Sequence, residues 1–176
     1  MNESTTKVDI GGHNALAGVG VVIWILGSLF GGLPALAGYI VLLVALHGIS
    51  SKLKIDAFRK ALIAMILSTI GFLIFFFVFG FSLLSAFSGS SKVSGTSFIL
   101  SFVIFYGTIV YGAYLFKKAF DEIADKTKHT LLKTAGAFMF WGAVLLIVFI
   151  GAFVYLIGLI ILAVAFFTNP KEVEVA

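Results

Sequence analysis

The sequence predicts an all-α integral membrane protein, a helical bundle of six transmembrane helices with both termini cytoplasmic. Composition, the length of the uncharged runs and the placement of basic residues support this prediction. Of 176 residues, 61% are hydrophobic and 11% charged, with a mean hydropathy of +1.16. A soluble domain is roughly 45–50% apolar and roughly 25% charged, and a soluble fold of this length could not bury the surplus. We therefore expect the lipid bilayer to be its first partner.

Charged residues divide the chain into four uncharged runs. No Asp, Glu, Lys or Arg occurs in residues 10–51, 61–91, 93–116 or 134–170. A crossing takes roughly 20 apolar residues. The second and third runs therefore contain one span each, at about 61–87 and 98–116.

The first and last runs are too long for one crossing each. A single helix over 15–46 would measure roughly 48 Å, against a hydrocarbon core of roughly 30 Å. The first run is broken by Gly31-Gly32-Leu33-Pro34, since glycine tolerates positive φ and proline removes a helical donor. The last run is broken more weakly, at Gly151-Ala152. We expect two helical hairpins, whose spans are 15–30, 34–50, 135–150 and 152–167.

The basic residues test this count. With six spans, 11 of the 12 Lys and Arg residues face the cytoplasm, and only Lys92 lies in the outer loop 88–97. With four spans, segments 50–60 and 117–133 would lie on the side of the membrane opposite the tails. The basic residues would then be divided between the two sides, against the positive-inside rule. Re-entrant hairpins would leave the sidedness unchanged, so charge does not separate them from full crossings.

The predicted layout is a polar N-terminal tail (1–14), one transmembrane domain (15–168) and a C-terminal tail (169–176), in the cell membrane. The tail contains Pro170, and we expect it to be disordered. The cytoplasmic segment 117–133 is an amphipathic connector, which continues the preceding span or lies along the interface. Its i,i+4 ion pairs favour a solvated connector over a site for anionic lipid or a partner.

Two segments of the terminal hairpins are similar to one another. Residues 38–46 and 158–166 are identical at five of nine positions. Broken helices in corresponding halves of a membrane protein are a pointer to transporter sites. In an alphabet this apolar, chance similarity is the alternative.

The sequence carries no motif for catalysis, a metal or a cofactor. It has no cysteine, no HExxH and no GxSxG. We therefore expect no catalytic, cofactor-binding or metal-binding residues and no enzymatic activity. The nearest candidate is His47 with Asp56, for which an interfacial histidine bonded to backbone or water is the favoured alternative. Intramembrane hydroxyls, which usually bond to their own backbone, occur at Ser28, Ser68, Thr69, Ser82, Ser101 and Thr108.

Other features bear on binding partners. Tyr106, Tyr111 and Tyr114 could line a groove for an amphipathic ligand, although anchoring and helix packing are favoured. The GxxxG of Gly27–Gly31 and the small pair Ala64 and Ser68 permit close helix contacts, as in a homo-oligomer or with another membrane protein. The net charge of +4 does not indicate nucleic-acid binding, because the basic residues lie at the ends of hydrophobic runs.

Several segments resemble a known family. They are the run Tyr111-Gly-Ala-Tyr-Leu-Phe-Lys-Lys-Ala-Phe-Asp-Glu-Ile-Ala-Asp-Lys-Thr, Leu132-Lys-Thr-Ala-Gly136, Trp141-Gly-Ala143 and the glycine-rich hairpin 17–38. Together they resemble the mainly archaeal multi-pass membrane proteins catalogued as domain of unknown function family 996. The resemblance implies the membrane class and topology, and it implies no activity and no site residues.

Three functions are then in competition. The first is a non-enzymatic protein that acts through helix packing, as an oligomer, accessory subunit or membrane organiser. The alternative is a transporter or channel-like protein for an uncharged or lipid-like substrate, since no charge lies inside a predicted span. It requires a cavity lined by Ser, Thr and Tyr. A membrane enzyme ranks last and requires His47 beside Asp56, or a carboxylate of 117–133 beside a hydroxyl.

Overall fold

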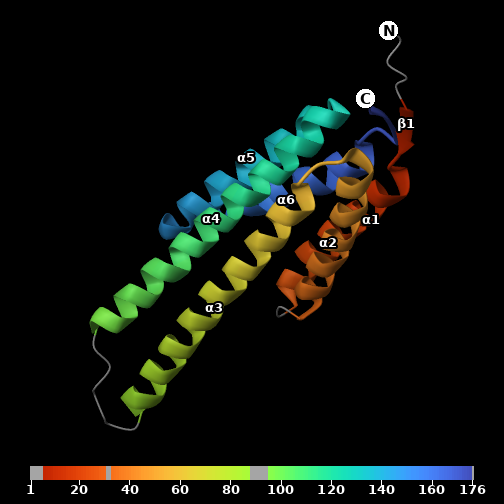
Figure 1. The fold of residues 1–176 in the computed structure, drawn as a ribbon. Helices are drawn as coiled ribbons and strands as arrows, with labels where there is room; N and C mark the ends of the chain where they lie inside the picture. The colour runs from red at the N-terminus through yellow and green to blue at the C-terminus, as the bar shows by residue number, and fades with distance from the viewer. Residues whose placement is uncertain (1–5, 31–32, 88–94, 176) are drawn as a thin grey trace.

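The computed structural model describes residues 6–30, 33–87 and 95–175, and these form a bundle of helices (Figure 1). The helices are α1 (Gly11–Leu29), α2 (Leu33–Leu53), α3 (Ala57–Phe87), α4 (Gly95–Thr127), α5 (Thr130–Val144) and α6 (Ile150–Thr168). Within the described residues, six helices are long and apolar enough to cross a membrane. The prediction of an all-α bundle with six transmembrane helices is confirmed.

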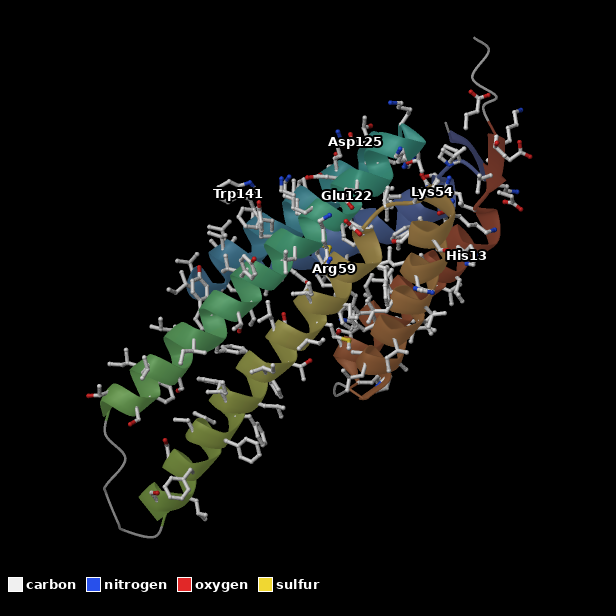
Figure 2. The ribbon with its side chains drawn as sticks, in the orientation of Figure 1. His13, Lys54, Arg59, Glu122, Asp125 and Trp141 are labelled. Atoms are coloured by element: carbon white, nitrogen blue, oxygen red, sulfur yellow. The ribbon has the colours of Figure 1, made fainter. Side chains whose placement is uncertain are left out.

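The helices form three antiparallel hairpins, α1–α2, α3–α4 and α5–α6. In the bundle α4 packs against α5, and α1 packs against α6, so the two terminal hairpins meet. Both chain ends lie at the same end of the bundle as the α2–α3 and α4–α5 connections (Figure 1). We call this the basic end, because the connections and tails there carry Lys52, Lys54 (Figure 2), Lys126, Lys128 and Lys171.

The two tails pair with each other at the basic end. Strand β1 (Thr6–Asp9) and strand β2 (Glu172–Val175) form an antiparallel two-stranded sheet. Beside it, the side-chain amide of Asn14 donates to the Pro170 carbonyl at 3.0 Å, and the Asn169 amide donates to Asn14 Oδ1 at 3.0 Å. The expectation of a disordered C-terminal tail is therefore wrong, because the ladder and the buried amides order it.

The reversal between the last two helices lies earlier than expected. A 3₁₀ turn, η1 (Leu145–Val148), follows α5, and Phe149 then takes the left-handed conformation with φ 60°. The expected break at Gly151-Ala152 is wrong, since both residues belong to α6. Gly151 is buried, and a Cβ there would overlap Gly142 O of α5 and Leu146 N of η1, so its missing side chain allows α6 to pack closely on both. In the first hairpin α1 ends at Leu29 and α2 begins at Leu33, and residues 31–32 lie outside the described residues.

The connector 117–133 is divided between two helices. Its first part continues α4 without a break to Thr127, and α5 begins at Thr130, five residues before the predicted span at 135. Between them Lys128 takes a left-handed φ of 58°, which ends one helix and starts the next. At the preceding connection Lys54 takes the same conformation, with φ 53°.

The tightest packing lies in the half of the bundle next to the basic end. The largest side chains that are fully buried include Ile10, Leu46, Ile49, Leu53, Phe120, Ile123, Leu132 and Phe166. Helix α3 contributes the small residues Ala57, Ala61 and Ala64, which are also fully buried. Beyond these residues α3 packs mainly on α4, through rings such as Phe75 against Phe105 at 4.9 Å. The other half of the bundle is therefore more open.

Candidate functional site

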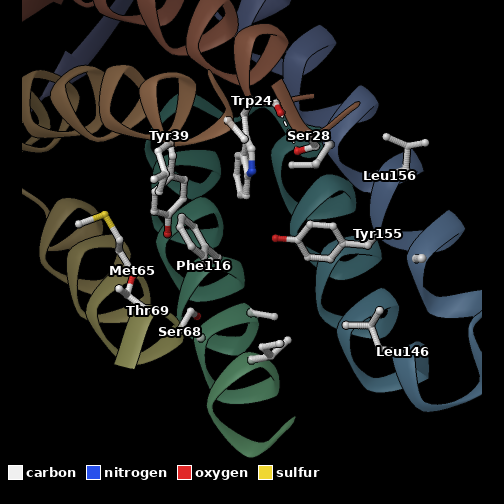
Figure 3. A pocket seen from close by; sticks show the side chains of 17 residues that line it. Trp24, Ser28, Tyr39, Met65, Ser68, Thr69, Phe116, Leu146, Tyr155 and Leu156 are labelled. Atoms are coloured by element: carbon white, nitrogen blue, oxygen red, sulfur yellow. Dashed lines mark hydrogen bonds between the residues drawn. The ribbon is translucent and has the colours of Figure 1, made fainter. Parts of the chain in front are cut away.

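The more open half of the bundle contains a cavity of about 570 Å³. Its wall includes side chains from α1, α2, α3, α4, η1 and α6 (Figure 3). Ligand cavities measure roughly 300–1,000 Å³, so this one has room for a small molecule. We define its mouth as Ser28, Leu36, Ala152 and Leu156, four exposed lining residues that lie toward the end opposite the basic end; Thr69 of α3 is a further exposed lining residue.

Glycine contacts set one wall of the cavity. At the α1–α2 contact, a Cβ on Gly20 would lie 2.6 Å from Leu42 N, and a Cβ on Gly38 would lie 2.6 Å from Gly20 O. The two backbones therefore touch, which only glycine allows at these positions. This approach brings the ring of Trp24 to 4.7 Å from that of Tyr39, centroid to centroid.

A second glycine contact sets the opposite wall. A Cβ on Gly142 would lie 2.5 Å from Tyr155 N, so α5 and α6 also pack backbone to backbone. The ring of Tyr155 consequently reaches toward α1 and lies 6.4 Å from Trp24. Gly158, which aligns with Gly38 in the internal similarity, is also at a helix contact, because its Cβ would lie 2.8 Å from Met139 N. The two aligned glycines thus play the same part in their hairpins.

Four aromatic rings from four helices close the inner end of the cavity. We call Trp24, Tyr39, Phe116 and Tyr155 the aromatic floor. Phe116 lies 5.6 Å from Tyr39 and 6.3 Å from Trp24, centroid to centroid. Figure 3 shows the hydroxyls of Tyr39 and Tyr155 directed into the space between the helices.

The cavity has few polar side chains, and one of them, Ser28, donates its hydroxyl to Trp24 O at 2.8 Å. Within the described residues, Trp24 Nε1, Tyr39 Oη and Tyr155 Oη make no hydrogen bond, and neither do the hydroxyls of Ser68 and Thr69. None of these atoms is among the side-chain polar atoms of the described chain that are both fully buried and without a hydrogen-bond partner. An unpaired polar group in an apolar environment is unfavourable unless water or a ligand bonds to it. The cavity therefore offers hydrogen bonds to an occupant.

The cavity carries no formal charge. Its lining contains no Asp, Glu, Lys, Arg or His, and most of its surface is hydrocarbon. Such a site favours uncharged, largely apolar molecules, because a charged group would be desolvated there without a counter-ion.

The structure does not assemble a tyrosine groove on the fourth span, for which anchoring and helix packing were the favoured alternative. Tyr106 donates its hydroxyl to the Val144 carbonyl at 2.6 Å, which ties α4 to the end of α5. Tyr111 and Tyr114 lie exposed on the outer surface of α4, with ring centroids 6.2 Å apart. Lys118 lies over the Tyr114 ring at 5.7 Å. The cavity uses tyrosines of α2 and α6 instead.

The small-residue pairs have a packing role. Gly27 is buried at the α1–α2 contact, and Gly31 lies outside the described residues. Ala64 and Ser68 face Gly112 of α4, where a Cβ would lie 2.6 Å from Ser68 Oγ. These contacts are made within the chain, and they leave the question of a homo-oligomer untested.

The candidate enzymatic residues are engaged in other contacts. His47 packs its ring on Phe58 at 4.8 Å, and Ser50 Oγ accepts a hydrogen bond from the Phe58 N–H at 2.8 Å. A surface hollow of about 470 Å³ does bring Ser50, Ser51, Asp56, Glu122 and Asp125 together. In residues 6–30, 33–87 and 95–175, no three His, Cys, Asp or Glu side chains could hold a metal ion.

Ion pairs occupy much of the connector 117–133. Lys117 Nζ lies 2.7 Å from Asp121 Oδ2, and Lys133 Nζ lies 2.6 Å from Asp125 Oδ1. Glu122 pairs with Lys60 across the α3–α4 contact. These pairs match a salt-bridged connector, and a site for anionic lipid on the remaining lysines stays a prediction.

Sequence reasoning missed Trp24, Tyr39 and Tyr155 as cavity residues. A partial signal was present, because Tyr39 lies within the internally similar segment 38–46 and Tyr155 lies three residues before the segment 158–166. Trp24 also lies inside a span rather than at the membrane interface that tryptophan prefers. The sequence does not show which rings face the cavity, because this depends on how the separate hairpins pack against one another.

Comparison with known proteins shows a family without an assigned activity. The model of the family described as "Protein of unknown function (DUF996)" matches residues 34–160. The uncharacterized protein MJ1644 of Methanocaldococcus jannaschii is 31% identical over 174 residues, covering 96% of this chain and 97% of that protein. No solved structure matches the chain. The chain with this cavity and six apolar helices therefore belongs to the DUF996 family of proteins of unknown function.

Proposed function

We propose that this protein is a cell-membrane carrier for an uncharged, lipid-like molecule, which binds in the cavity between the helices. The cavity itself is the observation that supports the proposal. It combines room for a ligand, a hydrocarbon lining, and hydroxyl and indole groups that have no partner among the described residues. A role limited to helix packing does not account for such a space, because a packed interior would be filled with side chains.

The absence of charge in the lining sets the class of molecule. An ion or a charged metabolite would be desolvated there with no counter-ion, which is costly. A lipid-like molecule would exchange one apolar environment for another and would gain contacts with the aromatic rings. The proposal involves no chemical change in the molecule carried, so it makes this protein a binding and transfer protein rather than an enzyme.

The sidedness of the cavity suggests how transfer would proceed. The mouth lies toward the end opposite the basic end, and the basic-end half of the bundle is closely packed. By the positive-inside rule the basic end faces the cytoplasm, so the mouth would face the outer half of the bilayer. Release on the cytoplasmic side would require the closed half to open.

The test uses two alanines on α2. Ala35 lines the cavity, whereas Ala37 is exposed on the helix and is not part of the lining. We expect the wild-type protein and the Ala37→Phe variant, purified from native membranes, to retain a neutral lipid that mass spectrometry of the extract detects. Ala35→Phe fills the cavity, and this variant should lose at least about nine-tenths of the bound lipid. That loss corresponds to a tenfold weaker affinity, or ~1.4 kcal/mol.

The same pair of variants gives the contradicting results. Equal retention of lipid by Ala35→Phe and Ala37→Phe would show that the lipid binds at the outer surface rather than in the cavity. Absence of any stoichiometric lipid from wild-type protein, and from protein incubated with a total lipid extract, would remove the support for a carrier.

A further inference from the structure

Serine and threonine hydroxyls in this protein differ in whether they bond to their own helix. Ser82 donates to Val78 O at 2.6 Å, Thr108 to Phe105 O at 2.8 Å and, at the mouth of the cavity, Ser28 to Trp24 O at 2.8 Å. This is the usual arrangement for serine and threonine in membrane helices. In the cavity Ser68 and Thr69 do not make that bond within the described chain. Past Ser28, the hydroxyls of the cavity therefore remain free for a ligand.

The free groups of the aromatic floor are hydrogen-bond donors. The indole N–H of Trp24 can only donate, and the phenolic hydroxyls of Tyr39 and Tyr155 can each donate one bond. These three donors come from α1, α2 and α6, and their rings lie within 6.4 Å of Trp24, centroid to centroid. A ligand that satisfies them must present oxygen atoms that accept hydrogen bonds.

We infer that the cavity takes a neutral lipid whose polar end carries an acceptor oxygen, such as a carbonyl or an ether, and whose remainder is hydrocarbon. The inference rests on the proposed function and specifies its ligand. The acceptor end lies at the aromatic floor, where Trp24, Tyr39 and Tyr155 donate to it. The hydrocarbon end extends along Leu36 and Leu156 to the mouth, where both residues are exposed.

The arrangement of the rings disfavours a cationic lipid. Aromatic rings can bind a quaternary ammonium group when they surround it. Here Trp24 and Tyr39 pack edge to face at 4.7 Å, and Phe116 lies 5.6 Å from Tyr39, so the rings contact each other rather than enclose a space. No carboxylate lines the cavity to balance a positive charge.

The two tryptophans of the chain provide the test. Trp24 belongs to the cavity, and Trp141 lies exposed on the outer surface of α5 (Figure 2). In a Trp141→Phe protein the fluorescence reports on Trp24 alone, and in a Trp24→Phe protein it reports on the lipid-facing Trp141. The probes are methyl 2-bromododecanoate, which has an ester acceptor, and 2-bromododecane, which has none. Bromine quenches tryptophan at short range, and the chain has no cysteine for the bromoester to alkylate.

We expect the ester to quench Trp24 saturably and at lower concentration than the hydrocarbon, whereas both probes quench Trp141 without saturation. In the Trp141→Phe background, Tyr39→Phe and Tyr155→Phe should each weaken ester binding by about two- to tenfold, the cost of one hydrogen bond. Both changes keep the ring, so the packing is preserved. Tyr111→Phe, on the exposed surface of α4, is the matched control and should leave binding unchanged.

The outcomes separate this inference from the proposed function. Saturable quenching by both probes with equal affinity, unchanged in Tyr39→Phe and Tyr155→Phe, would overturn the acceptor inference and leave a cavity for lipid-like molecules. Displacement of the ester by dodecyltrimethylammonium at lower concentration than by methyl dodecanoate would overturn the choice of a neutral ligand. No saturable quenching of Trp24 by either probe would contradict both the inference and the proposed function.

Discussion

The two halves of the bundle differ in how they are closed. In the half next to the basic end, large residues such as Leu46, Phe120 and Phe166 are fully buried, and the paired tails join α1 to α6. In the other half the same helices leave a cavity, and lining residues such as Leu36 and Leu156 are exposed. The difference shows that the helices pack closely at one end of the bundle and leave the polar groups of the cavity accessible from the other.

This asymmetry has a physical origin in the lengths and contacts of the hairpins. The helices of the terminal hairpins have 15 to 21 residues, or roughly 22 to 32 Å, and they pack through glycines. The central helices α3 and α4 have 31 and 33 residues, or roughly 46 and 50 Å, and extend past the others (Figure 1). Only the first part of α3 is buried against the terminal hairpins, so the helices part beyond Ala64.

The largest effect should come from breaking the cavity wall at Gly38. In Gly38→Ala the new Cβ would lie 2.6 Å from Gly20 O and would press on backbone atoms, which cannot rotate away. We expect a loss of at least about 3 kcal/mol of stability, measured by reversible unfolding in mixed detergent micelles. Gly107→Ala is the control, because a Cβ there meets no atom within 4 Å. Equal stability of the two variants would show that α1 and α2 are not in backbone contact.

The next largest effect should come from emptying the closed half at Phe120. Phe120 is fully buried and lies 5.7 Å from Phe116 and 6.1 Å from Phe166, centroid to centroid. Phe120→Ala should destabilise the protein by about 3 kcal/mol, mainly through the cavity it leaves. Phe153 is 72% exposed, so Phe153→Ala should change stability by less than about 0.5 kcal/mol. If thermal unfolding shows Phe153→Ala to be less stable than Phe120→Ala, the assignment of Phe120 to the closely packed half is contradicted.

A smaller effect should follow from opening the link between the tails at Asn14. Asn14→Leu removes the donor to Pro170 O and leaves the buried amide of Asn169 without its acceptor. The expected cost is about 2 kcal/mol, with faster amide hydrogen exchange in 172–175 than in the wild type. Unchanged exchange there would show that the strands do not depend on this contact.

The smallest effect should sharpen the comparison by strengthening the closed end. Lys128 is exposed and has a left-handed φ of 58°, a conformation that glycine adopts without strain. Lys128→Gly should therefore stabilise the protein by about 0.5–1 kcal/mol. The same change two residues earlier, Lys126→Gly, lies in the last turn of α4 and should destabilise by a similar amount. Thermal unfolding midpoints that move in the same direction for both would contradict the assigned helix end.

The helical spans could be predicted because charge and apolar length report directly on a bilayer. The turn before Pro34 could also be placed, since Gly-Gly-Leu-Pro disfavours a continuous helix. The second turn could not, because a glycine at 151 that allows close packing is indistinguishable in sequence from one that allows a reversal. There the chain turns through a 3₁₀ segment and a left-handed Phe149, which no propensity indicates.

The candidate site was predictable only in its chemistry. Hydroxyls and tyrosines in uncharged spans could be recognised, but Tyr106 and Tyr114 were as plausible as Tyr39 and Tyr155. The choice depends on which helices meet, and that is decided by contacts between residues far apart in the sequence. The strands at 6–9 and 172–175 were missed for the same reason, because four-residue segments form a sheet only when the two chain ends come together.

The one-sided access to the cavity can be measured with a single cysteine, since the chain has none. In Ser68→Cys protein, in sealed vesicles of known orientation, a small impermeant methanethiosulfonate reagent should label the thiol only from the side opposite the basic end. Adding Ala35→Phe, which fills the cavity, should slow labelling by at least about tenfold, whereas adding Ala37→Phe should not. Labelling from the basic side, no labelling from either side, or an equal effect of the two phenylalanines would contradict this account.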